Sequence, residues 1–271
     1  MIHLAHVLIR RLLIRPGAIG DFIVSLPALE SLRADFTEVW CAEQNVPLAR
    51  FADAAQSLVA AGLNRLGLLV ADDVIERLRG FDSIISWYGA GNPEFRALVA
   101  DLKLPFQFVP ALPDGNAQAV DFYNAQARSL GAAPASRYPR LHCSDQLCPT
   151  GLRIFAAIHP FASSPAKRAP LPIFEAAARI LAETMPVYWL CGAEETLPGA
   201  VRIENLYELA CWLAQARVFV GNDSGISHLA AAVGTPVRAL FRVTAPAIWA
   251  PRGSCVDAGY CSDGGYSFGS E

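Results

Sequence analysis

The chain has 271 residues, of which 53% are hydrophobic and 17% are charged, and its formal net charge is -3. This length allows one large domain or two ordinary ones, with a substantial buried core. A charge this close to neutral offers no basic surface to a phosphate backbone, so we expect no nucleic-acid partner.

Hydropathy and cysteine usage set further limits. The mean hydropathy is +0.31, but no apolar run approaches the roughly 20 residues of a membrane-spanning helix. The start, MIHLAHVLIRRLLIR, places its charges after the apolar stretch and lacks a small-residue cleavage site, which argues against a secretory signal. Two interpretations of this start stay open, contact with a membrane surface and an edge strand or poorly ordered start. Seven cysteines without a CxxC pair indicate reduced cytosolic thiols and no zinc site.

Short apolar runs alternate with helical patterns along the chain. In the first half, strands are expected at 12–14, 38–42, 83–87 and 106–109, and helices at 21–33, 93–102 and 120–131. Residues 131–150 contain prolines and show no periodicity, so they are the best linker candidate. Beyond them, strands are expected at 153–160, 187–192, 218–222 and 237–241, and helices at 172–185, 206–216 and 226–234.

This alternation predicts an α/β fold with parallel sheets covered on both faces. We expect two consecutive α/β domains, residues 1–145 and residues 146–271. Any ligand is expected between them, beyond the carboxyl ends of the strands. The final dozen residues are rich in glycine and serine and are expected to be loosely held.

Polar residues follow several of the expected strands, and the first group is RPGAIGD at residues 15–21. Gly17 and Gly20 allow a tight turn and a close approach of a ligand. Asp21 then begins a helix, either as a carboxylate that faces the crevice or only as an N-cap. This stretch alone does not decide between the two interpretations.

The second group lies in IHPFASSPAKRAP, residues 158–170. Ser163, Ser164, Lys167 and Arg168 follow an expected strand and precede an expected helix. Hydroxyls and cations in that place suit a diphosphate. The alternative is a solvated loop with two surface cations.

The third group lies in FVGNDSGISHL, residues 219–229. Ser224 and Gly225 are expected to begin a helix with free N–H groups, and His228 lies one turn further on the same side. Since a carboxylate repels phosphate, Asp223 is expected to accept hydrogen bonds from sugar hydroxyls. A capped helix with a packed histidine explains Asp223 but not His228. These residues are too local for a catalytic triad, and GNDSG is not a G-x-S-x-G elbow.

Together, RPGAIGDFIVSLPALESLR, HPFASSPAKRAP and FVGNDSGISHLAAAVGTPVRALF resemble the motifs of the ADP-heptose:lipopolysaccharide heptosyltransferases, glycosyltransferase family 9. The last stretch, which matches a D-[TS]-G-x-x-H motif, is the most specific part. The resemblance implies a GT-B fold of two facing Rossmann-like domains, with the acceptor on the first and the donor nucleotide on the second. It also implies an inverting, metal-independent transfer without a cofactor.

The resemblance implies roles for individual residues. Asp21 would be the general base on an acceptor hydroxyl, and Lys167 would neutralise the leaving diphosphate. Glu195 falls near the family's acidic residue for the ribose, with Glu194 as the alternative in the alignment. The residues that would hold the sugar and phosphates of the donor are Ser163, Ser164, Arg168, Asp223, Ser224, Gly225 and His228.

Four departures from the family pattern bear on activity. Phe161 and Arg242 stand where glycine is usual, Ala169 stands where tryptophan is frequent, and SDGGYSFGSE does not resemble the family's closing helix. They motivate a second hypothesis, a non-catalytic relative that binds a nucleotide sugar or acts as an assembly partner. A nucleotide-sugar epimerase of GT-B shape is a third hypothesis, which no residues support.

The leading hypothesis is an enzyme that moves a heptose or a related sugar from an ADP-sugar to a glycan or glycolipid acceptor, such as lipopolysaccharide core. Such an enzyme is expected in the cytoplasm, at the inner face of the membrane. The apolar, basic start would assist a peripheral contact there.

Overall fold

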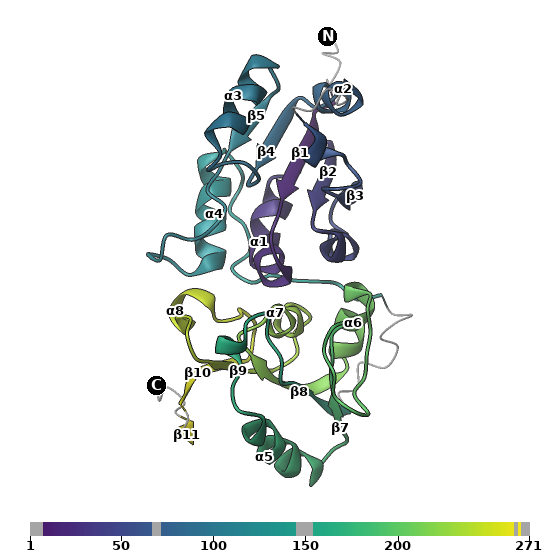
Figure 1. The fold of residues 1–271 in the computed structure, drawn as a ribbon, viewed down its shortest axis with the longest axis vertical. Coiled ribbons are helices and arrows are strands. Elements are labelled where there is room, and N and C mark those ends of the chain that lie inside the picture. Colours follow the sequence, from purple (N-terminus) through teal and green to yellow (C-terminus); the bar gives the residue numbers. More distant parts are fainter. Residues whose placement is uncertain (1–7, 67–71, 145–153, 263–264, 267–271) are drawn as a thin grey trace, which may run out of the picture. The chain divides into compact units, whose positions relative to one another are not determined.

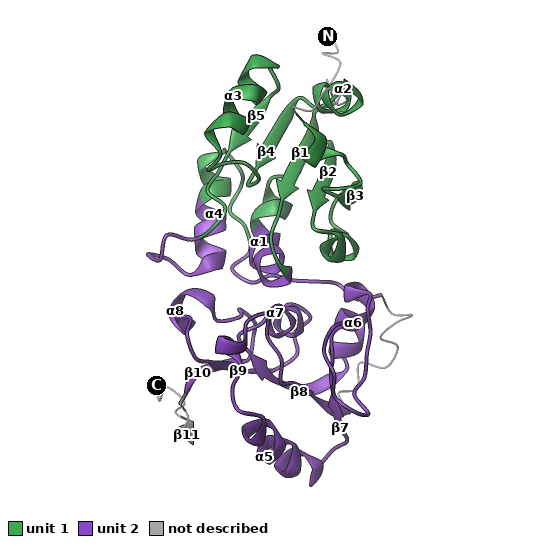
Figure 2. Ribbon diagram, viewed as in Figure 1, with its two compact units in different colours: residues 1–18, 28–112, 126–135 green, residues 19–27, 113–125, 136–271 purple. Residues whose placement is uncertain are grey.

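The computed structural model describes residues 8–66, 72–144, 154–262 and 265–266, and these residues form an α/β fold with two separate sheets (Figure 1). The chain divides into two compact units, neither of which is continuous in sequence (Figure 2). Unit 1 comprises residues 1–18, 28–112 and 126–135, and unit 2 comprises residues 19–27, 113–125 and 136–271. The expected domain boundary between residues 145 and 146 lies outside the described residues.

The sheet of unit 1 has five parallel strands in the order β3-β2-β1-β4-β5. β1 is its central strand, so this part of the apolar start is not an edge strand, and residues 1–7 lie outside the described residues. Arg10 lies 4.3 Å from the centre of the Phe36 ring, and Arg11 Nη1 donates to the Leu32 carbonyl over 2.8 Å. The strands are β1 (Arg10–Arg15), β2 (Phe36–Cys41), β3 (Ala54–Ser57), β4 (Ser83–Ser86) and β5 (Phe106–Phe108).

Apolar side chains from the strands and helices form the core of unit 1, with Leu12, Ile14 and Trp40 among its fully buried members. α3 starts where the Asn92 side chain accepts a hydrogen bond from the Phe95 N–H, which caps the helix. α1 and α4 each contribute residues to both units. The helices of this half are α1 (Ile19–Ser31), η1 (Glu43–Leu48), η2 (Leu63–Arg65), α2 (Asp72–Arg79), α3 (Pro93–Asp101) and α4 (Ala119–Ser129).

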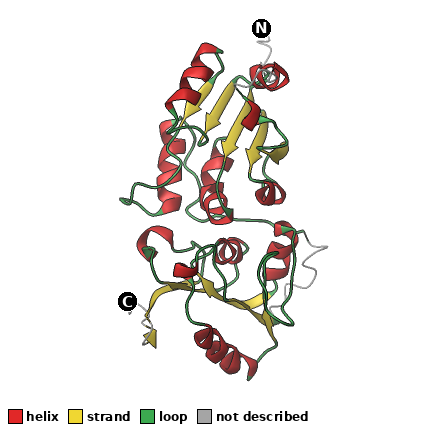
Figure 3. Cartoon of the chain, viewed as in Figure 1, coloured by secondary structure: helices red, strands yellow, loops and turns green. Residues whose placement is uncertain are grey.

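The sheet of unit 2 has the order β11-β10-β9-β8-β6-β7, and all neighbours are parallel except β10 and β11. α5 lies on one face of this sheet and α6 and α7 lie on the other (Figure 3). The strands are β6 (Phe155–His159), β7 (Val187–Trp189), β8 (Ala216–Asn222), β9 (Val237–Phe241), β10 (Val256–Ser262) and β11 (Gly265–Tyr266). The helices are η3 (Pro165–Lys167), α5 (Leu171–Ala182), α6 (Leu206–Leu213), α7 (Gly225–Ala232) and α8 (Pro246–Trp249).

Two of the sequence expectations need correction. α1 begins at Ile19, which places Asp21 in the first turn rather than at the N-cap. The sequence did not predict this earlier start, because glycine, here Gly20, is a poor helix former. The expectation of a loosely held end is wrong for residues 259–262, since they belong to β10, which pairs with β9. Residues 263–264 and 267–271 lie outside the described residues.

Candidate functional site

Lys167, Asp223 and Thr244 meet at the carboxyl ends of β8 and β9. Lys167 Nζ lies 2.7 Å from Asp223 Oδ2, and Thr244 Oγ1 donates to the same oxygen. The Asp223 side chain is 6% exposed, whereas the Lys167 side chain is 28% exposed. The lysine therefore compensates a buried carboxylate and still reaches solvent, where an anion can contact it. Thr244 was not among the expected residues, and no local pattern marks it.

His228 is buried one turn into α7, and three charged groups affect its pKa. Burial lowers its pKa to about 4, with Asp223 and Asp21 acting to raise the value and Lys167 acting to lower it. The imidazole is therefore neutral at pH 7, so it offers one N–H donor rather than a positive charge. Because the charge of Asp21 affects the pKa of His228, the first turn of α1 belongs to the same cluster, and both lie in unit 2.

The start of α7 is closely packed. Ser224 is the N-cap, as expected, but its side chain makes no capping hydrogen bond. Its Oγ is buried and has no hydrogen-bond partner among the described residues. A Cβ on Gly225 would lie 2.6 Å from Ile19 Cβ, and a Cβ on Gly20 would lie 3.3 Å from His228 Cδ2. Glycine is thus required at position 225, and the Ser224 hydroxyl keeps its hydrogen-bonding capacity for a ligand.

Asn222 holds the loop of the second motif against the end of β8. Its Oδ1 accepts the Ala169 N–H and its Nδ2 donates to the Pro160 carbonyl, each over 2.8 Å. Asn222 is 0% exposed. Both ends of segment 160–169 are therefore fixed beside Asp223, which positions Lys167. The sequence marked Asn222 only as a member of GNDSG, although a buried amide at a strand end was a usable signal.

Of the departures from the family pattern, Phe161 lies within this loop and Arg242 contacts the loop from outside. The Arg168 guanidinium lies 5.7 Å from the centre of the Phe161 ring, and its Nε and Nη2 donate to the Ala162 carbonyl over 3.1 and 3.0 Å. Arg242 Nη1 donates to the Arg168 carbonyl over 3.1 Å. The guanidinium of Arg168 thus binds its own loop, and Arg242, the residue after β9, supports that loop.

Glu195, in the loop after β7, lies beside His159, the last residue of β6, and the two form a second cluster. Its Oε2 is 2.9 Å from His159 Nε2 and accepts the Gly192 N–H over 2.6 Å. Burial raises the pKa of Glu195. The hydrogen bonds from His159 and Gly192 and the charges of His159 and Arg168 together lower the pKa by more, so its net shift is downward. Glu194 is exposed. Of the two carboxylates, the geometry favours Glu195 as a ligand-binding group.

The structure groups most of the expected site residues in unit 2. Ser164 is the residue before η3, in the loop of Lys167 and Arg168, and Ser163 in that loop is exposed. Gly17 lies in unit 1 with a φ of 112°, and its carbonyl accepts a hydrogen bond from Asn45 Nδ2 over 3.2 Å. The residues of the cluster around α7 are Gly20, Asp21, Lys167, Asp223, Ser224, Gly225 and His228.

Within the described ranges, no three His, Cys, Asp or Glu side chains gather in a way that could hold a metal ion. No helix of that part of the chain is long and apolar enough to cross a membrane.

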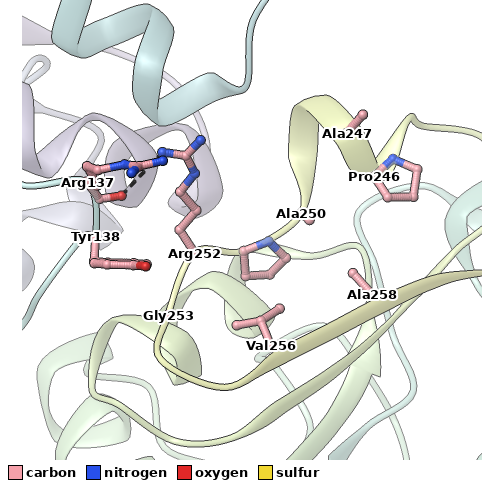
Figure 4. A pocket seen from close by; sticks show the side chains of 10 residues that line it. Arg137, Tyr138, Pro246, Ala247, Ala250, Arg252, Gly253, Val256 and Ala258 are labelled. Carbon is pink, nitrogen blue, oxygen red and sulfur yellow. Dashed lines mark hydrogen bonds between the residues drawn. The ribbon is translucent and has the colours of Figure 1, made fainter. Parts of the chain in front are cut away.

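A cavity of about 710 Å³ lies in unit 2, with Arg137, Tyr138 and Arg252 at one end and Pro246 and Ala247 at the other (Figure 4). None of the expected site residues lines this cavity.

Solved glycosyltransferases of the GT-B class share this fold. A glycosyltransferase family 9 protein from Veillonella parvula matches with a TM-score of 0.74 and 17% identity, over 93% of this chain and 86% of that chain. E. coli ADP-heptose lipopolysaccharide heptosyltransferase II matches with a TM-score of 0.69 and 20% sequence identity, over 92% of this chain and 90% of that chain. E. coli heptosyltransferase WaaC with ADP matches with a TM-score of 0.68 and 16% sequence identity, over 94% of this chain and 94% of that chain. The expected GT-B fold is therefore confirmed.

The family follows from the sequence model of glycosyltransferase family 9 (heptosyltransferase), which matches residues 116–258, more than half of the chain. The chain belongs to glycosyltransferase family 9. The expected family and the expected enzyme class, a glycosyltransferase, are thus confirmed. A comparison with curated proteins gives no match.

Proposed function

We propose that this glycosyltransferase transfers a heptose or a related sugar from an ADP-sugar to a glycan or lipopolysaccharide-core acceptor, with inversion and without a metal ion or cofactor. The carrying observation is the pair Lys167–Asp223, with a nitrogen–oxygen distance of 2.7 Å, beside the unpartnered buried hydroxyl of Ser224 at the start of α7. A helix start, a hydroxyl and a cation together suit a diphosphate.

The donor's diphosphate takes its hydrogen bonds from Ser224 Oγ, the first N–H groups of α7 and Lys167. His228 is neutral, so it adds a hydrogen bond and leaves the charge balance to Lys167. As Lys167 turns to the phosphate, the Asp223 carboxylate keeps Thr244 and accepts hydrogen bonds from sugar hydroxyls. Further contacts to the donor come from Ser163, Ser164, Arg168, Gly225 and, at the ribose, Glu195.

Asp21 acts as the general base in the transfer step. Its carboxylate takes the proton of an acceptor hydroxyl, whose oxygen bonds to the anomeric carbon of the sugar. The bond from that carbon to the diphosphate oxygen breaks, and its electron pair leaves with the nucleoside diphosphate. Lys167 and the N–H groups of α7 stabilise the charge on the leaving group, which is the need that a metal ion otherwise meets. Attack opposite the leaving group inverts the anomeric configuration.

The acceptor and the location are part of the same proposal. The solved WaaC structure contains ADP, the leaving group that we propose here. A glycolipid acceptor places the enzyme at the cytoplasmic face of a membrane, with the segment before β1, whose Leu8 and Ile9 are exposed, making a peripheral contact. Co-sedimentation with anionic vesicles checks this contact, and recovery of all protein in the supernatant contradicts it.

Turnover of ADP-heptose with a lipopolysaccharide-core acceptor tests the function, with ADP release and product mass as readouts. Asp21→Asn is expected to lower kcat by roughly 10²–10⁴-fold, because a positioned base contributes that much. Asp101→Asn, at an exposed position at the end of α3, is the matched control and should behave as wild type. Addition of EDTA should leave the rate unchanged. ADP binding without turnover would favour the non-catalytic relative instead.

A further inference from the structure

His159 lies in the second cluster, away from Lys167 and Asp223, and contacts Glu195 in a defined way. A carboxylate only accepts hydrogen bonds, so the 2.9 Å contact requires the hydrogen on His159 Nε2. The Gly192 N–H donates to the same oxygen, Oε2, over 2.6 Å. Oε1 makes no hydrogen bond to another residue in the described part of the chain. One oxygen of Glu195 is therefore fixed twice, and the other remains available.

The backbone around Glu195 does not depend on His159. Arg202 Nη1 donates to the carbonyls of Gly192 and Ala193, and its Nη2 donates to the Glu195 carbonyl over 2.7 Å. One guanidinium thus holds the loop through three carbonyl groups. What His159 adds is the direction of the Glu195 side chain.

The imidazole of His159 is itself confined. The residue is 4% exposed, and its ring centre lies 5.8 Å from that of Phe161 at 59° between the planes. Its Nδ1 is buried and has no hydrogen-bond partner among the described residues. A buried nitrogen without a partner costs free energy, so a purely structural site would favour an apolar side chain here. Phe161, which stands where the family usually has glycine, packs its ring beside the imidazole.

We propose that His159 is a positioning residue for the nucleoside end of the donor, since it directs Glu195 Oε1 toward the hydroxyl groups of a ribose. β6 and β7 are neighbours in the sheet, and ligands of such sheets bind beyond the carboxyl ends of the strands. The lowered pKa of Glu195 keeps this acceptor ionised at neutral pH. The inference rests on the proposed function, because it requires a nucleotide in unit 2.

Binding of ADP and of 2′,3′-dideoxy-ADP tests the inference by calorimetry. Loss of a hydrogen bond to a carboxylate weakens binding by roughly 10–100-fold, so the wild type should prefer ADP by that factor. His159→Met keeps the size of the side chain but has no donor, and its preference should fall to about threefold or less. His159→Gln places an N–H donor near the position of Nε2 and should retain most of the preference.

Arg202→Met is the matched control, because it removes the hydrogen bonds to the loop carbonyls and keeps both donors to Glu195 Oε2, His159 Nε2 and the Gly192 N–H. It should weaken both nucleotides by a similar factor and leave the preference intact. An unchanged preference in His159→Met, with ADP still bound by the wild type, would overturn the positioning role alone. Failure of the wild type to bind ADP at all would instead count against the proposed function. In turnover assays with varied ADP-heptose, His159→Met should raise KM for the donor and leave kcat within about threefold.

Discussion

Replacing Asn222 by alanine should release the loop that carries Lys167. The change removes the partners of two buried backbone groups, the Ala169 N–H and the Pro160 carbonyl, which each lie 2.8 Å from the Asn222 amide. A buried group left without its partner costs about 1–3 kcal/mol, so the two together are worth about 3 kcal/mol. That free energy corresponds to an increase of roughly 100-fold in the opening equilibrium of segment 160–169.

Amide hydrogen exchange of peptides that cover residues 160–169 measures this opening directly. Asn222→Ala should remove most of the protection of the Ala169 amide and weaken ADP binding, because Lys167 is no longer held beside Asp223. Ser163→Ala is the control for stability, since Ser163 is exposed in the same loop and should change the unfolding free energy by less than about 0.5 kcal/mol. Protection of Ala169 within about threefold of wild type in Asn222→Ala would refute the reasoning.

Two further predictions concern α7. The pKa of His228 is lowered to about 4 in the folded protein, so the unfolded chain binds a proton first as the pH falls below about 6.5. His228 should therefore cost about 2 kcal/mol of stability near pH 5 relative to pH 8. His228→Asn should make the urea midpoint depend less on pH across that range. An unchanged pH dependence in the variant would contradict the lowered pKa of His228. Gly225→Ala puts a Cβ 2.6 Å from Ile19 Cβ and should destabilise the protein by about 1–3 kcal/mol in thermal unfolding. Gly91→Ala, with open space around its Cβ, should be near neutral, and equal effects of the two changes would be a contrary result.

The sequence predicted most strands of the two sheets because buried parallel strands are short apolar runs that differ sharply from their surroundings. It failed where pairing rather than composition forms the strand. β3 consists of Ala54–Ser57, which lacks β-branched residues, and it is held by its register with β2. β10 contains glycine and cysteine and is held by β9. Such strands are stabilised by partners distant in sequence.

The candidate site shows the same division. The positions of Lys167, Asp223 and His228 could be expected because each follows a strand end within a short motif. Thr244 and Asn222 were missed, since their roles come from contacts with Asp223 and with the loop 160–169. The neutrality of His228 also could not be predicted, because it results from burial rather than from neighbours in sequence.

Nucleotide binding by unit 2 is the central claim, and calorimetry with ADP, UDP and GDP on wild type and Lys167→Ala tests it most directly. ADP should bind selectively, and Lys167→Ala should weaken it by at least about tenfold, because the Asp223 carboxylate is then left facing the diphosphate without its cation. Lys103→Asn removes the only other lysine and should have no effect. Absence of binding by all three nucleotides, or full ADP affinity in Lys167→Ala, would contradict the account.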